Sequence, residues 1–115
     1  MDDDYAYHVA EGEVFVLERD GRIGAVCVLI AAPDHLLLDN VAVDPDLHGS
    51  GLGRVMIRFA EDEARNRGFA ELRLFTNVRM LSNIALYERL GFVETHRGEA
   101  GGHHRVFMTK MLGTA

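Results

Sequence analysis

The sequence predicts a mixed α/β sheet in which an antiparallel meander is followed by βα units. Two β-rich runs, residues 14–18 and 22–31, are joined by Asp20-Gly21, a dipeptide typical of tight hairpins because both residues tolerate positive φ. Further on, a helix pattern separates two strand-like runs, residues 36–43 and 71–76. A helical crossover makes such strands parallel, and a cofactor is then expected at their carboxyl ends.

The chain of 115 residues is long enough for one domain and one core. Residues 2–11 are predicted to form a short helix, because the aspartates suit a first helical turn and Gly12 interrupts the pattern. Residues 36–43 are apolar at nearly every position, so both faces of this strand are expected to be covered. Asp39 and Asn40 are the polar exceptions.

Two helices are predicted in the second half of the chain. Residues 52–67 have apolar side chains at helical spacing, and Gly68 can supply the C-terminal cap. Residues 81–90 form the second helix, which Ser82 could cap and which Gly91 ends. The remaining strands are expected at residues 71–76, 92–97 and 105–112.

The net charge and the distribution of apolar residues limit the kinds of binding partner that this protein can have. The net charge of −6 disfavours nucleic acid, which requires clustered Lys and Arg, whereas it is compatible with a cationic substrate such as an amine. No apolar run approaches the roughly 18 residues that span a membrane, and no leader pattern follows Met1, so we expect a cytoplasmic protein without a membrane partner. Cys27, the single cysteine, is expected to be a small buried side chain.

A glycine-rich loop lies between the strand at 36–43 and the helix at 52–67. The backbone N–H groups of Gly49, Ser50, Gly51, Leu52 and Gly53, with the positive end of the helix dipole, predict a phosphate-binding loop. The dinucleotide spacing G-x-G-x-x-G fails, because Arg54 or Met56 stands where the third glycine would be. The P-loop pattern also fails, since no Gly-Lys-Ser/Thr follows.

The segment from His48 to Gly53 resembles the Q/R-x-x-G-x-G/A pyrophosphate motif of the GNAT superfamily of acetyl-CoA-dependent N-acetyltransferases. Asn83-x-x-Ala-Leu-Tyr87, followed by Gly91-Phe92, is similar to a second signature of that family. Two departures stand out. His48 replaces the usual Gln or Arg, and residues 1–12 are a short remnant of the family's N-terminal helical region.

The resemblance implies a GNAT-like sheet over residues 1–115 and transfer of an acetyl group from acetyl-CoA to an amine of a small molecule or peptide by direct attack. The alternative is a CoA-binding sensor or subunit without catalysis. Because the family's N-terminal elements help to form the acceptor site, a partner subunit could supply the missing wall, and a homodimer is expected.

The resemblance also implies roles for individual residues. His48, Gly49, Ser50, Gly51, Leu52 and Gly53 would bind the pyrophosphate. Arg54 and Arg58 lie one turn apart near the start of the helix, where they could face the phosphate or equally form a solvated helix face. The N–H of Val41 would stabilise the oxyanion, Val43 would pair with the pantetheine amide, and Tyr87 would protonate the leaving thiolate.

The residues that orient the substrate and that act as the general base are less well defined. Asn83, one helical turn before Tyr87, would orient the pantetheine arm or a water molecule. Asp39 or Glu71 could deprotonate the amine, and a solvent-linked water chain is an equal alternative. No metal site is expected, because the side chains of the adjacent His103 and His104 point to opposite faces of a strand.

Overall fold

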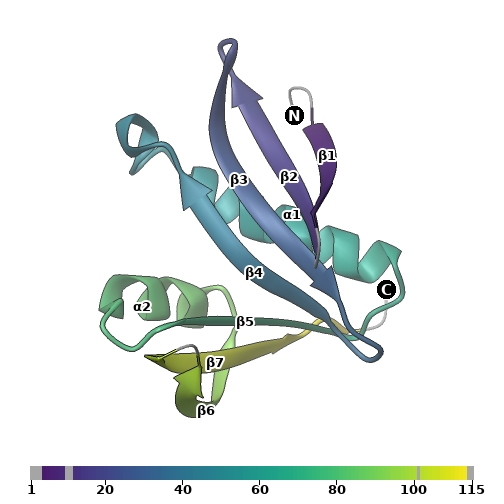
Figure 1. Cartoon of the computed structure of the whole chain (residues 1–115), viewed down its shortest axis with the longest axis vertical. Helices are drawn as coiled ribbons and strands as arrows, with labels where there is room; N and C mark the ends of the chain where they lie inside the picture. The colour runs from purple at the N-terminus through teal and green to yellow at the C-terminus, as the bar shows by residue number, and fades with distance from the viewer. Residues whose placement is uncertain (1–3, 10–11, 101, 114–115) are drawn as a thin grey trace.

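The computed structural model describes residues 4–9, 12–100 and 102–113, with residues 4–9 described by their backbone alone. The described residues form a seven-stranded sheet in the order β1-β2-β3-β4-β5-β7-β6, with the long helix α1 lying across one face (Figure 1). The strands are β1 Asp4–Val9, β2 Gly12–Arg19, β3 Arg22–Ala31, β4 Leu36–Val43, β5 Glu71–Asn77, β6 Val93–Ala100 and β7 His103–Met111. The helices are η1 Pro45–Leu47, α1 Leu52–Asn66 and α2 Leu81–Arg89.

The predicted fold class is confirmed. The pairs β1–β2, β2–β3 and β3–β4 are antiparallel, whereas β4 and β5, which α1 connects, are parallel. The hairpin between β2 and β3 turns at Asp20 and Gly21, both with positive φ (55° and 79°). This backbone matches the right-handed twist of the flanking strands, so the dipeptide sets the register Arg19↔Arg22.

The short helix predicted over residues 2–11 is wrong for residues 4–9, which form β1 instead. This strand pairs antiparallel with β2, for example Tyr7 with Val14. The sequence of β1 places Tyr5, Tyr7 and Val9 at alternate positions, a strand period, and the edge of β2 offers the backbone hydrogen bonds. Residues 2, 3, 10 and 11 lie outside the described residues.

The core lies between α1 and the sheet. Its buried side chains include Met56, Ile57 and Ala60 of α1, packed with Leu36 and Leu72 of the parallel strands. Cys27 is also buried in this cluster, as predicted. Within the described residues, no helix is long and apolar enough to cross a membrane.

The ends of the two helices differ in how well local sequence predicts them. Gly68 follows α1 with φ of 84°, and the N–H of Phe69 donates to Ala64 O at 2.9 Å, so the glycine cap is confirmed. The predicted Ser82 cap is wrong, because α2 starts at Leu81 with Met80 as its N-cap. The turn before α2 is instead closed by Asn77, whose Oδ1 accepts from the Arg79 N–H at 2.9 Å.

Candidate active site

A cleft opens where the parallel strands separate. β4 and β5 pair over only three residues, Leu36–Leu38 with Leu72–Leu74, although β4 continues to Val43 and β5 to Asn77. Beyond this pairing the two ribbons diverge, with η1 at the end of β4 and α2 beside β5 (Figure 1). The carboxyl half of β4 is therefore only partly covered, which corrects the expectation that both its faces are buried throughout.

Asp39 is an extra residue in β4 at the point of separation. Leu38 pairs with Leu29 and Asn40 with Val28, so Asp39 has no opposite residue on β3 and forms a bulge. A bulge bends its strand and increases the local twist, which accounts for β4 turning away from β5 here. The two polar residues that interrupt the apolar run thus mark the start of the cleft.

The backbone of β4 is oriented so that two amides face the cleft. The N–H of Asp44 donates to Gly24 O on β3 at 2.8 Å. Because hydrogen-bonded and non-hydrogen-bonded residues alternate along an antiparallel pair, the N–H groups of Val43 and Val41 point to the other side, away from β3. These are the two amides for which the family resemblance implies ligand contacts.

The glycine loop has the backbone of an anion site. Gly49 and Gly51 have φ of 83° and 87°, a region that side chains other than glycine rarely adopt. Gly51 is the N-cap of α1 and makes no side-chain capping bond, so the amides of the first helical turn have no partner within the helix. Gly53 is helical, and a Cβ there would meet only Val43 Cγ2 at 4.0 Å, so packing does not demand this glycine.

A cavity of about 880 Å³ lies in front of this loop. Its walls are the end of β4, the loop and one face of α2, and its lining includes Val41, Val43, Leu47, His48, Gly49, Ser50, Gly51, Leu52, Gly53, Arg54, Ile57, Met80, Asn83, Leu86, Tyr87 and Arg89. Every predicted cofactor-binding residue is in this set. Arg58, one turn beyond Arg54 on α1, is exposed and outside the lining.

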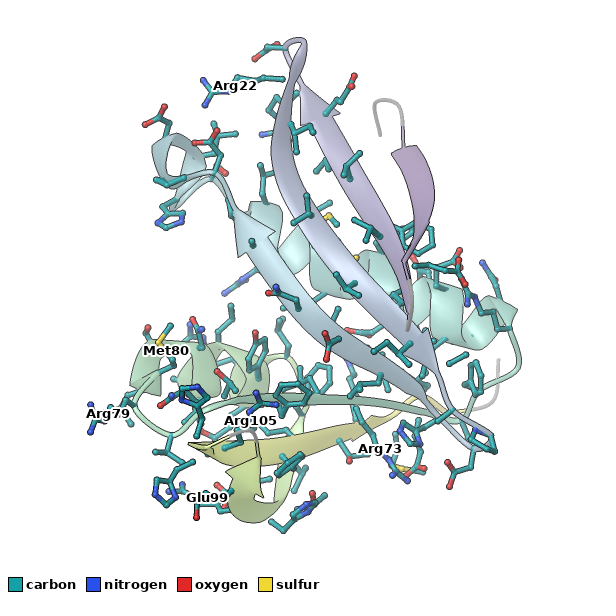
Figure 2. All side chains as sticks on the ribbon, in the orientation of Figure 1. Arg22, Arg73, Arg79, Met80, Glu99 and Arg105 are labelled. Atoms are coloured by element: carbon teal, nitrogen blue, oxygen red, sulfur yellow. The ribbon has the colours of Figure 1, made fainter. Side chains whose placement is uncertain are left out.

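Sequence reasoning missed several lining residues of this cavity, among them Met80 and Arg89 at the two ends of α2. Met80 precedes the helix (Figure 2), and Arg89 ends it, so both line the same cavity as the glycine loop only because of where α2 is placed in the fold. A basic residue in the last turn of a helix has an ordinary local explanation, its interaction with the helix dipole. No pattern in the sequence distinguishes that role from phosphate binding.

A second, smaller pocket of about 220 Å³ adjoins the large cavity. Its lining includes the polar residues Asp39, Asn40 and Thr76. Four residues line both spaces, and these are Val41, Met80, Asn83 and Tyr87. The predicted oxyanion amide and the predicted acid therefore lie at the boundary between a long cavity and a polar pocket.

Tyr87 is partly buried in this boundary. Its ring meets Phe92 edge-on, with centroids 6.0 Å apart, and burial raises the pKa of its phenol above the usual value of 10.0. The phenol is therefore protonated at neutral pH and can donate a proton. Asn83, one turn earlier on α2, lines the same two spaces.

The imidazole of His48 is held against the end of β4. Its Nε2 lies 3.1 Å from the carbonyl oxygen of Val43, and since a carbonyl only accepts, Nε2 carries the proton. In the neutral ring Nδ1 then has no proton to give to a phosphate. The ring therefore contributes a donor at Nδ1 only when it is protonated.

The two candidate bases are separated by the fold. Asp39 lines the polar pocket, whereas Glu71 lies at the amino end of β5, where Arg73 Nη2 donates to its Oε2 at 2.9 Å. Because parallel strands place their carboxyl ends together, residues at the amino end of β5 are remote from the cleft, and Glu71 is not part of the site. Within residues 12–100 and 102–113, no cluster of three or more His, Cys, Asp or Glu could hold a metal ion.

A split parallel pair, a glycine loop at a helix start and a long cavity between them are the architecture of an acyl-CoA-binding domain. Residues 10–94 match the family model of the acetyltransferase (GNAT) domain, so the chain belongs to the GNAT family. It is 40% identical over 80 residues to the [ribosomal protein bS18]-alanine N-acetyltransferase of Escherichia coli strain K12, covering 70% of this chain and 54% of that one. The chain thus spans about half the length of the curated relatives it matches.

Solved structures agree with this assignment. The crystal structure of the ribosomal-protein-S18-alanine N-acetyltransferase from Escherichia coli is similar with a TM-score of 0.81 and 31% identity, over 94% of this chain and 74% of that one. A GNAT family acetyltransferase from Elizabethkingia anophelis with acetyl-CoA bound has a TM-score of 0.79 at 19% identity, over 89% of this chain and 77% of that one. The second likeness concerns the fold alone.

Proposed function

We propose that this protein transfers the acetyl group of acetyl-CoA to an amine nitrogen of a small molecule or peptide. The observation that carries the proposal is the boundary at which Val41, Asn83 and Tyr87 line both the long cavity and the polar pocket. A thioester reaching this boundary from the glycine loop would meet an amine entering from the polar side. Holding both reactants in this way supplies much of the rate enhancement in a direct transfer.

The donor is held mainly by backbone groups. The N–H of Ser50, one of the predicted phosphate donors, is already used, because it donates to Leu47 O at 3.1 Å. The pyrophosphate takes the other amides of the loop and those of the first turn of α1, with Arg54 and Arg89 as cationic walls of the same cavity. The pantetheine arm follows the separated half of β4, where the amide of Val43 faces it. Acetyl-CoA is a consumed substrate here, and no resident cofactor is needed for the reaction.

The chemistry is a direct substitution at the thioester carbonyl. The neutral amine forms a bond to the carbonyl carbon, and the oxyanion that develops accepts the N–H of Val41. The carbon–sulfur bond then breaks, and Tyr87 gives its proton to the thiolate, which leaves as CoA. The attacking nitrogen loses one proton, to Asp39 or to a water molecule in the polar pocket, and the product is an acetamide.

The acceptor class is supported by both charge and similarity. The polar pocket contains a carboxylate, which suits a cationic amine before it loses its proton. The Escherichia coli relative is named for acting on the alanine of ribosomal protein bS18, which favours a peptide N-terminus among amine acceptors. We therefore place a peptide amine first and a small-molecule amine second.

The proposal is tested by incubating the chain with radiolabelled acetyl-CoA and a panel of amines that contains alanine-starting peptides and polyamines. Labelled product is expected with at least one amine, and calorimetry is expected to detect CoA binding. Binding without turnover on any amine would favour the CoA-binding sensor or subunit. Absence of CoA binding would exclude both functions.

We also propose that the protein forms a homodimer through the sheet face opposite α1. That face carries a cavity of about 870 Å³ with an apolar lining that includes Leu37, Phe75 and Phe107. At its margin Val93 and Met111 are 67% and 66% exposed. Covering these side chains with a second copy would remove them from water and could complete the acceptor wall.

The cytoplasmic location expected from the sequence stays a prediction.

We expect sedimentation equilibrium at micromolar concentration to give the mass of a dimer. Met111→Glu should shift the equilibrium toward the monomer, because it places a charge in the apolar contact. Ile23→Glu is the matched control, since Ile23 is 53% exposed on the distant β2–β3 hairpin and should leave the mass unchanged. A wild-type chain that sediments as a monomer would contradict the dimer.

A further inference from the structure

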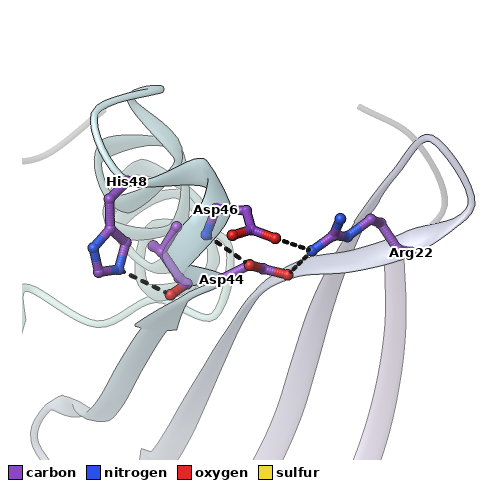
Figure 3. Close-up of polar contacts among 5 residues, drawn as sticks. Arg22, Asp44, Asp46 and His48 are labelled. Atoms are coloured by element: carbon purple, nitrogen blue, oxygen red, sulfur yellow. Dashed lines mark hydrogen bonds and ion pairs between the residues drawn. The ribbon is translucent and has the colours of Figure 1, made fainter.

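An arginine on the β2–β3 hairpin binds the turn that leads into the glycine loop. Arg22 Nη2 donates to Oδ2 of Asp44 and, at 3.3 Å, to Oδ2 of Asp46 (Figure 3). These residues are 22 and 24 positions apart from Arg22 in the sequence, so the contact ties two separate segments together. The reaction scheme above makes no use of it.

Asp44 transmits this contact to the turn. Its second oxygen, Oδ1, accepts the N–H of Asp46 at 2.9 Å, and this bond caps η1. The carbonyl of Leu47, the last residue of η1, then accepts both the N–H of Ser50, at 3.1 Å, and the Ser50 hydroxyl. The N–H of Leu47 in turn donates to Asp44 O at 2.8 Å, so Asp44 and Leu47 connect the Arg22 guanidinium to the glycine loop.

The same contact has an electrostatic consequence. Asp44 and Asp46 place two carboxylates just before a loop that would bind a pyrophosphate, and like charges at short range repel. Arg22 offsets these charges. The pKa of Asp44 lies below its usual value, mainly because Arg22 donates a hydrogen bond to its carboxylate and to a smaller extent because the Asp46 amide does. Without the guanidinium, the anion would approach two uncompensated negative charges.

We propose that Arg22 is a positioning residue of the CoA pyrophosphate site, which holds the Asp44–Asp46 turn in shape and neutralises it. The inference rests on the proposed binding of acetyl-CoA at the glycine loop. Arg22 need not touch the ligand, because it acts through Asp44 and η1. Its effect should therefore be confined to donors that carry a pyrophosphate.

The experiment compares Arg22→Gln with the wild type on two acetyl donors, acetyl-CoA and S-acetylpantetheine, which lacks the pyrophosphate. We expect the KM for acetyl-CoA to rise about three- to fivefold, the scale of an exposed charge contact, with kcat unchanged. The KM for S-acetylpantetheine should stay the same. Arg22→Lys, which keeps the charge without the forked geometry, should give an intermediate KM.

Arg19→Gln is the matched control, because Arg19 is exposed on the same hairpin and lies opposite Arg22 in the ladder. It should leave both KM values unchanged. Higher salt should reduce the difference between Arg22→Gln and the wild type, since the effect is partly electrostatic.

Three outcomes would decide against the inference. An equal rise in KM for both donors in Arg22→Gln would mean that Arg22 stabilises the fold in general. An unchanged KM for acetyl-CoA would mean that Arg22 has no role in pyrophosphate binding. A variant that fails to fold in circular dichroism is replaced by Arg22→Lys, for which a wild-type KM would overturn the proposal. Failure of the wild type to bind CoA would refute the proposed function itself, and calorimetry on the wild type distinguishes that case.

Discussion

Replacing Tyr87 by Phe is expected to lower kcat for acetyl transfer by about 100-fold, the low end of what a positioned general acid contributes. The ring and its contact with Phe92 are retained, so the affinity for CoA should not change. The expected result is therefore a loss in kcat with an unchanged dissociation constant, which initial rates and calorimetric titration measure separately.

The pH profile gives a second test of the same role. Tyr87 donates a proton only in its protonated form, so kcat should fall as the pH rises through its pKa. Because burial raises that pKa, the fall should begin at a higher pH than a free tyrosine would give. Tyr87→Phe should lack this high-pH limb. Ser82→Ala, which removes an exposed hydroxyl from the same helix, is the control. Full activity in Tyr87→Phe would assign the proton to water.

Replacing Lys110 by Met is expected to lower the free energy of unfolding by about 2 kcal/mol. Lys110 Nζ donates to Oε1 of Glu61 at 2.9 Å, and the side chain of Glu61 is only 8% exposed. Met preserves the apolar stem but leaves a buried carboxylate with Arg65, at 3.7 Å, as its remaining cation. Urea unfolding followed by circular dichroism measures the change.

The double variant Lys110→Met with Glu61→Gln separates charge from packing. If the loss in Lys110→Met comes from the stranded carboxylate, the second substitution should restore part of the stability. Arg97→Met is the control, because Arg97 pairs with Glu94 at the surface and such pairs contribute little. A Lys110→Met chain as stable as the wild type would show that Arg65 alone satisfies Glu61.

Features of the fold that depend only on residues close together in the sequence were predictable. Asp20-Gly21 sets its hairpin because the two positive φ angles are a property of those residues. The spacing of apolar residues predicts α1, because one helix face must be buried against the sheet. Two predictions were wrong because the structure of the segment depends on another part of the chain. Residues 4–9 become a strand because the edge of β2 is available to them, and Ser82 falls inside α2 because the Asn77 turn sets where that helix begins.

The glycine loop was predicted for the same local reason, since positive φ at Gly49 and Gly51 and free amides at a helix start follow from residue type and order. The resemblance to the GNAT family then indicated Asn83 and Tyr87, and both line the cavity that the loop faces. Their chemical roles stay predictions.

The sequence by itself therefore determined the order of the strands and the two main helices from β2 onward, the glycine loop and the family. Only the tertiary structure decided which of two carboxylates lies in the cleft, that Arg89 lines the same cavity as the loop, and that the His48 ring donates to the carbonyl of Val43. It also decided that Arg22 meets Asp44. The physical reason is that these contacts join residues far apart in the chain, and their geometry follows from strand separation and helix placement, which no local pattern encodes.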